Sequence, residues 1–217
     1  MTANADHGAT SDRDPRDRAI EVLTVVLLGI ATVASAWCAY QASRWNGIET
    51  DEARVTTEAR VEQARLFATG TQVGSYDSNV LLAYAQAVAA DQPSLAEFIR
   101  DTLMRPEFAP VLETWEQEVE ADAAQLSPIP ANVDYIAELF AGANDAEQSA
   151  VEASARAADA GSNAEAYLLT TLFMASALFF AGVVSSFESR GPRIVLLTMS
   201  MVMLAAGAAR IVELPIG

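Results

Sequence analysis

Three long apolar runs stand out along the chain, separated by polar segments. The first run, 19–42, carries one charge, Glu21, and its first 22 residues would reach about 33 Å as a helix, enough to cross a hydrocarbon core of about 30 Å. The second run, 166–187, has no charged residue. The third, 194–212, crosses fully if Arg210 extends its side chain to the membrane surface. We therefore predict three transmembrane helices.

The first run also allows a second interpretation, as a cleaved signal peptide. Arginines precede it, and Ala34-Ser35-Ala36 has the small-x-small form of a cleavage site. Apolar residues nevertheless continue beyond that site, from Trp37 to Tyr40, which favours a retained span. Either interpretation leaves the segment that follows on the outer side of the membrane.

The segment between the first two spans, 43–165, has apolar residues at spacings of three, four and seven, which is typical of helices and not of strands. Alanine-rich sequences without proline adjoin both spans, so we expect the spans to continue as helical stalks that pair as an antiparallel hairpin. The first stalk is expected to end near Ala68. Prolines punctuate shorter helices between the stalks, where Ser94 is a predicted N-cap.

The predicted fold is therefore all-α: an integral membrane protein with three transmembrane helices and an inserted helical bundle whose stalks continue the first and second spans. A polar tail, 1–18, is expected to be disordered. The apolar positions expected in the bundle core are Val80, Leu81, Tyr84, Val88, Leu95, Phe98, Ile99, Leu103, Phe108, Val111, Leu112, Trp115, Val119, Tyr135, Ile136, Leu139 and Phe140.

Acidic residues concentrate in the central segment. From 46 to 165 the chain has 22 aspartates and glutamates against 6 arginines, a net charge of -16 that equals the charge of the whole chain. The chain has no lysine and one cysteine, Cys38, so an intrachain disulfide is excluded. A domain this acidic repels phosphate backbones, which excludes nucleic acid as a partner.

Arginines next to the spans indicate the orientation in the membrane. The short link 188–193 carries two arginines, and the N-terminal flank carries three. Because positive charge in short loops favours the cytoplasmic side, we predict a multi-pass protein of the cell membrane with a cytoplasmic N-terminus and an extracytoplasmic central domain. Arg44, Arg54 and Arg60 after the first span, and Arg210 after the third, favour the opposite orientation.

Polar and aromatic residues cluster at the outer end of the first span: Trp37, Tyr40, Gln41, Arg44 and Trp45. Their guanidinium and amide groups lie on neighbouring helical turns, where charge-assisted hydrogen bonds could hold a lipid phosphate or another anionic ligand. The alternative is an interfacial anchor of aromatic and arginine side chains.

Two polar features lie within the central domain. Arg105 and Glu107 flank Pro106 and form either part of a ligand pocket or a helix start with Glu107 in its first turn. An acidic run between 113 and 122 could attract a divalent cation, but it lacks the glycine-bearing loop of a calcium site and a neighbouring histidine. We therefore predict a solvated helix face, and no metal, cofactor or catalytic residue.

Small residues recur every four positions in the first two spans, which suits close helix packing in a bilayer. Such a stripe serves contacts within one chain or between chains, and a pore lining is the alternative. The predicted stripe comprises Ala31, Ser35, Ala39, Ala177, Ala181 and Ser185.

Three stretches of the sequence contain motifs that are similar to those of a known family. The segment from Ala36 to Gly47 has the form W-x-A-Y-Q-x-x-R-W-x-G, residues 105–108 read R-P-E-F, and residues 178–182 read L-F-F-A-G. Together they resemble a family of uncharacterised three-span bacterial membrane proteins, over about 20–209 of this chain. The resemblance implies the three-span architecture and no particular activity. Cys38 stands where serine is commoner in the first motif.

These features favour a non-catalytic, membrane-anchored interaction or scaffold protein that presents its acidic domain to a partner. We expect contact with membrane lipid, and assembly as a homo-oligomer or with another membrane protein. The alternatives are a homo-oligomeric channel or transport accessory subunit, and an extracytoplasmic sensor that acts through a partner. No ionisable residue lies mid-span, which disfavours coupled transport by this chain alone. No nucleophile motif or phosphate-binding loop is present, so we do not expect an enzyme.

Overall fold

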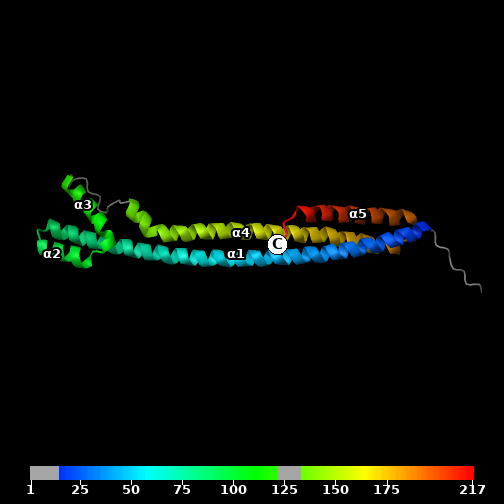
Figure 1. Cartoon of the computed structure of the whole chain (residues 1–217), viewed down its shortest axis with the longest axis horizontal. Helices are drawn as coiled ribbons and strands as arrows, with labels where there is room; N and C mark the ends of the chain where they lie inside the picture. The colour runs from blue at the N-terminus through cyan, green and yellow to red at the C-terminus, as the bar shows by residue number, and fades with distance from the viewer. Residues whose placement is uncertain (1–14, 122–132) are drawn as a thin grey trace, which may run out of the picture. The chain divides into compact units, whose positions relative to one another are not determined.

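The computed structural model describes residues 15–121 and 133–217, and the regular structure in these residues is entirely helical (Figure 1). The all-α prediction is therefore confirmed. The elements are α1 (Pro15–Ala89), α2 (Pro93–Phe98), the π-helical turn η1 (Ile99–Leu103), the 3-10 turn η2 (Pro106–Phe108), α3 (Ala109–Ala121), α4 (Val133–Val183), the 3-10 turn η3 (Val184–Ser186) and α5 (Arg190–Glu213).

The chain divides into two compact units. The apolar unit comprises the described residues up to Asp51 together with 156–217, and the acidic unit comprises 52–155. Helices α1, α4 and α5 each contain a stretch long and apolar enough to cross a membrane, which confirms the prediction of three such helices.

Helix α1 is uninterrupted over 75 residues. It begins at Pro15, a residue favoured in the first helical turn, so the last part of the predicted polar tail is helical, while 1–14 lie outside the described residues. The predicted end of the first stalk near Ala68 is wrong, because α1 continues through Gly70 and Gly74 to Ala89. Packing against α4 outweighs the weak helix propensity of the two glycines.

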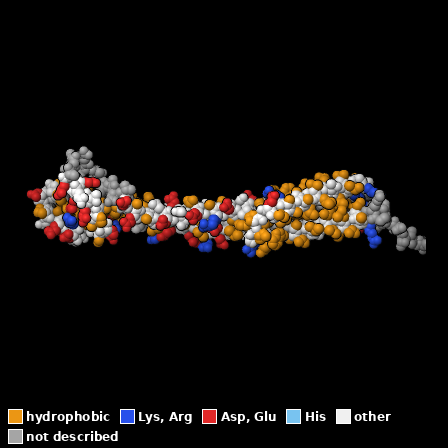
Figure 2. All heavy atoms as spheres, turned by 45° about the horizontal axis from the view of Figure 1, so that its top comes forward, with side chains coloured by type: hydrophobic (Ala, Val, Ile, Leu, Met, Phe, Trp, Pro, Cys, Tyr) orange, Lys and Arg blue, Asp and Glu red, His pale blue; other side chains and the backbone are white. Residues whose placement is uncertain are grey.

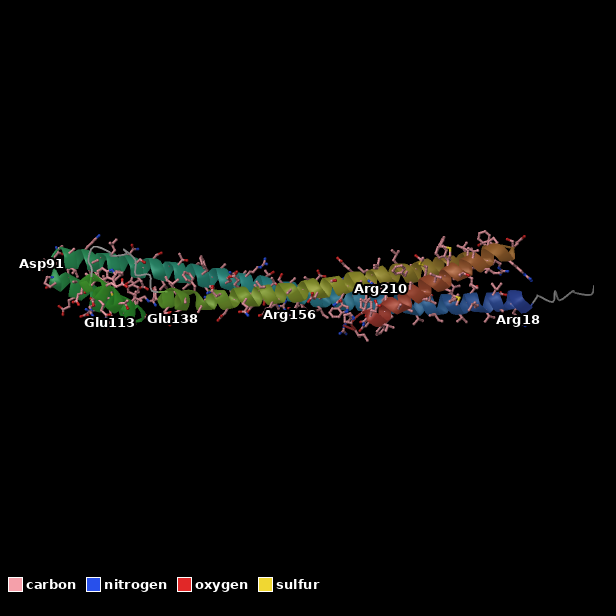
Figure 3. The ribbon with its side chains drawn as sticks, turned by 90° about the horizontal axis from the view of Figure 1, so that it is seen from above. Arg18, Asp91, Glu113, Glu138, Arg156 and Arg210 are labelled. Atoms are coloured by element: carbon pink, nitrogen blue, oxygen red, sulfur yellow. The ribbon has the colours of Figure 1, made fainter. Side chains whose placement is uncertain are left out.

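Helix α1 ends in a Schellman turn at Asp91, which is labelled in Figure 3. The Gln92 amide donates to the Ala87 carbonyl over 3.0 Å, and the Asp91 amide donates to the Val88 carbonyl over 3.1 Å. Asp91 adopts a left-handed φ of 54°, which aspartate tolerates better than most residues. Gln92 is the N-cap of α2, so the predicted N-cap at Ser94 is wrong.

Within the acidic unit, α1 and α4 run antiparallel and approach each other closely. Leu66 of α1 lies against Gly142 of α4, and further along α1 Gly70 lies against Phe140. A β-carbon at Gly70 would come within 2.9 Å of the Phe140 ring and within 3.0 Å of a backbone oxygen of α4. Glycine on α1 and alanine on α4 therefore set the short separation. The buried alanines of α4 in this unit are Ala143, Ala150 and Ala153.

The core of the acidic unit lies where α2, η1 and α3 cover the C-terminal part of α1. Most predicted core positions on α1 and α3 are buried there, and so is the predicted Ile99. The prediction is wrong for five exposed positions, and Ala96, which was not predicted, is buried; the exposed positions are Val88, Leu95, Phe98, Leu103 and Ile136. The buried cluster comprises Val80, Leu81, Tyr84, Ala87, Ala96, Ile99, Phe108, Val111 and Leu112.

In the apolar unit, α5 packs on α4 through small residues. The Ser200 hydroxyl of α5 donates to the Ala177 carbonyl of α4 over 2.8 Å in a buried position, and Gly207 lies against the Met174 side chain. Helix α5 begins at Arg190, so it takes in part of the predicted link 188–193. Near the start of α1, the buried cluster comprises Leu27, Val184 and Leu197.

The surfaces of the two units differ in chemistry. Figure 2 shows hydrophobic side chains gathered over the apolar unit and many carboxylates on the acidic unit. Large apolar side chains of the apolar unit point outward, including Val33, which is 72% exposed, and Phe179, which is 65% exposed. Such a surface suits lipid rather than water.

We expect Gly70→Ala to destabilise the acidic unit by about 1–2 kcal/mol, because the added methyl group overpacks the α1–α4 contact. Gly47→Ala is the matched control on the same helix, since a β-carbon there meets no atom within 4 Å. That control should stabilise the helix by about 0.5–1 kcal/mol. Hydrogen-exchange protection of α1 in the full chain measures both effects, and equal protection in the two variants would contradict the packing argument.

Candidate functional site

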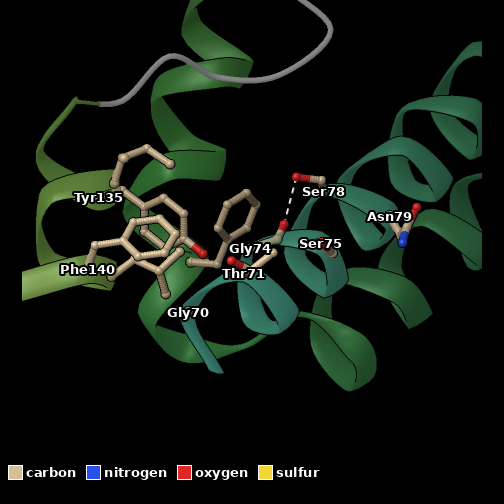
Figure 4. A pocket seen from close by; sticks show the side chains of 11 residues that line it. Gly70, Thr71, Gly74, Ser75, Ser78, Asn79, Tyr135 and Phe140 are labelled. Carbon is tan, nitrogen blue, oxygen red and sulfur yellow. Dashed lines mark hydrogen bonds between the residues drawn. The ribbon is translucent and has the colours of Figure 1, made fainter. Parts of the chain in front are cut away.

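A cavity of about 500 Å³ opens in the acidic unit between α1 and the N-terminal part of α4 (Figure 4). Tyr135 and Phe140 project from α4 toward α1, where Gly70 leaves room for Phe140 and Gly74 leaves room for Leu139. A cavity of this size lies in the range of small-ligand and side-chain pockets. The lining residues are Gly70, Thr71, Gly74, Ser75, Ser78, Asn79, Phe108, Tyr135, Ile136, Leu139 and Phe140.

The cavity has an apolar side and a polar side. Aromatic and aliphatic residues of α4 and Phe108 form the apolar side, while short polar residues of α1 form the other. The Ser78 hydroxyl donates to the Gly74 carbonyl over 2.7 Å, and the Thr71 hydroxyl donates to the Phe67 carbonyl over 2.9 Å. Because both hydroxyl hydrogens bond to backbone carbonyls of α1, the hydroxyl oxygens keep lone pairs that can accept hydrogen bonds. These two oxygens therefore accept hydrogen bonds, while Ser75 and Asn79 on the same side can both donate and accept.

A buried carboxylate lies next to this cavity. Asp77 of α1 is 1% exposed, and its Oδ2 accepts from Arg105 Nη1 over 3.0 Å and from the Tyr135 hydroxyl. Arg105 also contacts the Glu107 carboxylate over 3.3 Å. The second Asp77 oxygen, Oδ1, is buried without a hydrogen-bond partner among the described residues. The network fixes η2 and the start of α4 against α1, and so holds Phe108 and Tyr135, two of the three aromatic residues that line the cavity.

Burial and the hydrogen bond to Asp77 raise the pKa of the Tyr135 hydroxyl. The hydroxyl therefore stays protonated and keeps donating to Asp77 at physiological pH. Its ring packs edge-on against Phe108 with 5.3 Å between the ring centroids. Tyr135 thus links the polar network to the apolar wall.

Arg105 and Glu107 do not line the cavity, although the sequence suggests them for a pocket. Arg105 precedes Pro106, the first residue of η2, and Glu107 lies in the first turn, so the structural interpretation of this motif agrees with the observed helix start. The sequence analysis missed Asp77, and it placed Tyr135 in the bundle core without a polar role. One signal was available, because Asp77 is the only charged residue between Arg65 and Asp91.

A second polar network joins α1 and η1 to α3. The Tyr84 hydroxyl donates to Glu116 Oε1 over 2.6 Å, and Arg100 Nη1 contacts the same oxygen over 3.3 Å. Burial, and then the hydrogen bond to Glu116, raise the pKa of Tyr84. Glu116 belongs to the acidic run 113–122, whose Asp122 lies outside the described residues. No group of histidine, cysteine and carboxylate side chains arranged to hold a metal occurs among the described residues.

The residues predicted at the end of the first span do not form one site. Trp37 and Tyr40 are exposed, with 6.0 Å between their ring centroids, and Arg44 Nη1 donates to the Tyr40 hydroxyl over 3.4 Å. Gln41 points the opposite way and is fully buried, and its amide has no hydrogen-bond partner among the described residues. Trp45 turns toward the C-terminal segment.

The C-terminal segment is tied to α1 and α4 within the apolar unit. The Pro215 carbonyl accepts from Trp45 Nε1 and from the Tyr167 hydroxyl, each over 3.1 Å. The Tyr167 side chain is buried beside Cys38 and Ala42. Both aromatic donors thus have a structural partner that no local sequence signal indicates.

Only part of the predicted small-residue stripe faces other helices. Ala31, Ala177 and Ala181 are buried, whereas Ala39 and Ser185 are exposed and Ser35 is half-buried with an unpartnered hydroxyl. The physical reason is the helical period of about 3.6 residues, so positions spaced by four drift around the helix. The buried face of α1 alternates spacings of three and four and passes through Cys38 rather than Ala39.

No known family model, curated protein or solved structure is significantly similar to this chain. The resemblance to a three-span family therefore stays a prediction.

We expect Asp77→Ala to destabilise the acidic unit by about 2 kcal/mol, because it leaves Arg105 without its buried partner and Tyr135 without an acceptor. Glu58→Ala is the control, since its pair with Arg54 is solvent-exposed and should contribute less than about 0.5 kcal/mol. Urea unfolding of the full chain, followed by hydrogen exchange in α1 and α4, measures both. Similar losses in the two variants would show that the Asp77 network does not stabilise the unit.

Proposed function

We propose that this chain is a non-catalytic interaction protein of the cell membrane. Its three apolar helices cross the bilayer, its N-terminus is cytoplasmic and its acidic unit is extracytoplasmic. The acidic unit binds a segment of a partner protein that carries a large apolar anchor residue flanked by basic side chains. The cavity beside Asp77 receives the anchor.

This proposal rests on one observation: a cavity with an apolar wall lies in a strongly acidic unit. Residues 52–155 include 18 aspartates and glutamates against 5 arginines, a net charge of -13. A field of this sign attracts basic segments and speeds their encounter. The apolar wall then favours an aromatic or aliphatic anchor, and the hydroxyl oxygens on α1 accept from donor groups beside it.

The chemistry of the lining supports binding rather than catalysis. None of the described residues that line the cavity is a carboxylate, histidine, cysteine or arginine. Asp77 lies behind the wall and is held by Arg105 and Tyr135. The serine and threonine hydroxyls of the lining would need such a group as a general base to act as nucleophiles, and those of Ser78 and Thr71 donate to backbone carbonyls instead.

Membrane insertion and orientation rest on the apolar unit. Its outward-facing valine, leucine and phenylalanine side chains match a hydrocarbon environment, and its helices satisfy their backbone groups internally. Arginines in the N-terminal flank and at the start of α5 support a cytoplasmic location for both segments.

Single cysteines test the orientation in a Cys38→Ser background. Ser94→Cys reports on the acidic unit and Ser189→Cys on the segment between η3 and α5, and both positions are exposed. We expect a membrane-impermeant maleimide to label Ser94→Cys, and not Ser189→Cys, on intact cells. Labelling of both in opened cells is the reactivity control. The reverse pattern on intact cells would place the acidic unit in the cytoplasm and refute the orientation.

Photocrosslinking from two matched threonines tests partner binding. Thr71 lines the cavity, Thr57 lies elsewhere on the same helix, and both are exposed and donate to a carbonyl four residues earlier over 2.9 Å. With a photoreactive amino acid in place of Thr71, we expect a protein adduct in native membranes. Its crosslinked peptide should be rich in lysine or arginine and contain a large apolar residue.

A synthetic copy of that peptide should bind Thr71→Leu about tenfold more weakly than the unmodified chain, since the leucine fills part of the cavity, and should bind Thr57→Leu unchanged. Fluorescence anisotropy with the full chain in nanodiscs measures this. No adduct at position 71, the same adduct at both positions, or a crosslinked segment that is acidic or not protein would each overturn the proposal.

A further inference from the structure

A second cavity, of about 580 Å³, lies in the apolar unit where the start of α1, the end of α4 with η3, and the start of α5 meet. Its position at the ends of all three apolar helices is the level of lipid headgroups if these helices span the bilayer. The lining residues are Glu21, Thr24, Val25, Leu28, Ala181, Gly182, Val184, Ser185 and Arg193.

One carboxylate and one guanidinium line this cavity, so its formal charges balance. Arg193 contributes from α5, and its Nε atom is buried without a hydrogen-bond partner among the described residues. Glu21 contributes the carboxylate from α1. A buried guanidinium nitrogen without an acceptor is costly, so an acceptor-rich group such as a phosphate stabilises this arrangement.

The remaining polar atoms present acceptors. The Thr24 hydroxyl donates to the Ile20 carbonyl over 2.8 Å, and the Ser185 hydroxyl donates to the Gly182 carbonyl over 3.3 Å. Their oxygens keep lone pairs toward incoming donors. Together with the Glu21 carboxylate they suit a group with several N–H bonds, and a primary ammonium carries three.

The cavity continues onto an outward-facing apolar surface. Val25 is 64% exposed, and Leu28 is half-buried beside it on α1. A β-carbon at Gly182 would meet no atom within 4 Å, so the wall of α4 is open there. An acyl chain can lie along this surface while its headgroup occupies the polar part of the cavity.

We propose that this cavity binds a zwitterionic aminophospholipid. Arg193 holds the phosphate, Glu21 and the two hydroxyl oxygens hold the ammonium group, and an acyl chain follows Val25 and Leu28. A headgroup with phosphate alone offers no N–H donor to the Glu21 carboxylate and the two hydroxyl oxygens, and a trimethylated ammonium cannot donate hydrogen bonds. This proposal needs membrane insertion and is independent of partner binding by the acidic unit.

Native mass spectrometry of the full chain tests it, after release from nanodiscs that contain equal amounts of phosphatidylethanolamine, phosphatidylcholine and phosphatidylglycerol. We expect the retained lipid to be mainly phosphatidylethanolamine. Arg193→Gln should reduce its retention about tenfold, the loss typical of a charge-assisted hydrogen bond. Glu21→Gln should shift the preference toward phosphatidylglycerol, a change of selectivity that simple unfolding would not produce.

Arg210→Gln is the matched control, because Arg210 lies in the last turn of α5, far from Arg18 and the start of α1 (Figure 3). It should leave lipid retention unchanged. Equal retention of the three lipids by the unmodified chain, an unchanged lipid ratio in Glu21→Gln, or equal losses in Arg193→Gln and Arg210→Gln would each overturn the proposal. Displacement of the lipid by millimolar inorganic phosphate would instead identify a simple anion site and overturn it too.

Discussion

The close approach of α1 and α4 through glycine and alanine is the constraint on which the rest of the structure depends. In the acidic unit, Gly70 leaves no room for a β-carbon, and alanines of α4 face α1. At so short a separation, a large side chain fits where it faces a glycine, as Phe140 does at Gly70 and Leu66 does at Gly142. The space between the aromatic side chains of α4 and the short residues of α1 becomes the cavity. The pocket is thus a consequence of tight helix pairing.

The close packing of α1 and α4 also removes water from polar groups near the contact. Asp77 loses its water when α1 is covered, and hydrogen bonds from Arg105 and Tyr135 replace that water. The exposed pair Arg54–Glu58 on the same helix has no such role, since solvent already stabilises both charges. A buried pair of this kind specifies which segments meet. It joins α1, the start of η2 and α4 beside the cavity.

Several polar side chains of the apolar unit also form hydrogen bonds within the protein. The Ser200 hydroxyl and the two aromatic donors to Pro215 find their acceptors inside the unit, whereas the Ser35 hydroxyl and the Gln41 amide have no hydrogen-bond partner among the described residues. The Arg193 Nε atom and the Glu21 carboxylate lie near the starts of their helices. Helices this long and apolar, with charged residues near their ends, are compatible with a bilayer.

The sequence by itself determined what depends on neighbouring residues along one helix: the three apolar runs, the helical character of the central segment, and the concentration of negative charge. Hydrophobicity and period are local properties, so they can be counted without knowing the fold. The tertiary structure alone decided that α1 continues past Gly70, that Gln41 faces inward while Tyr40 faces outward, and that Arg105 meets Asp77. Each of these depends on contacts between residues distant in sequence, because a partner helix supplies the packing or the charge that overrides local preference.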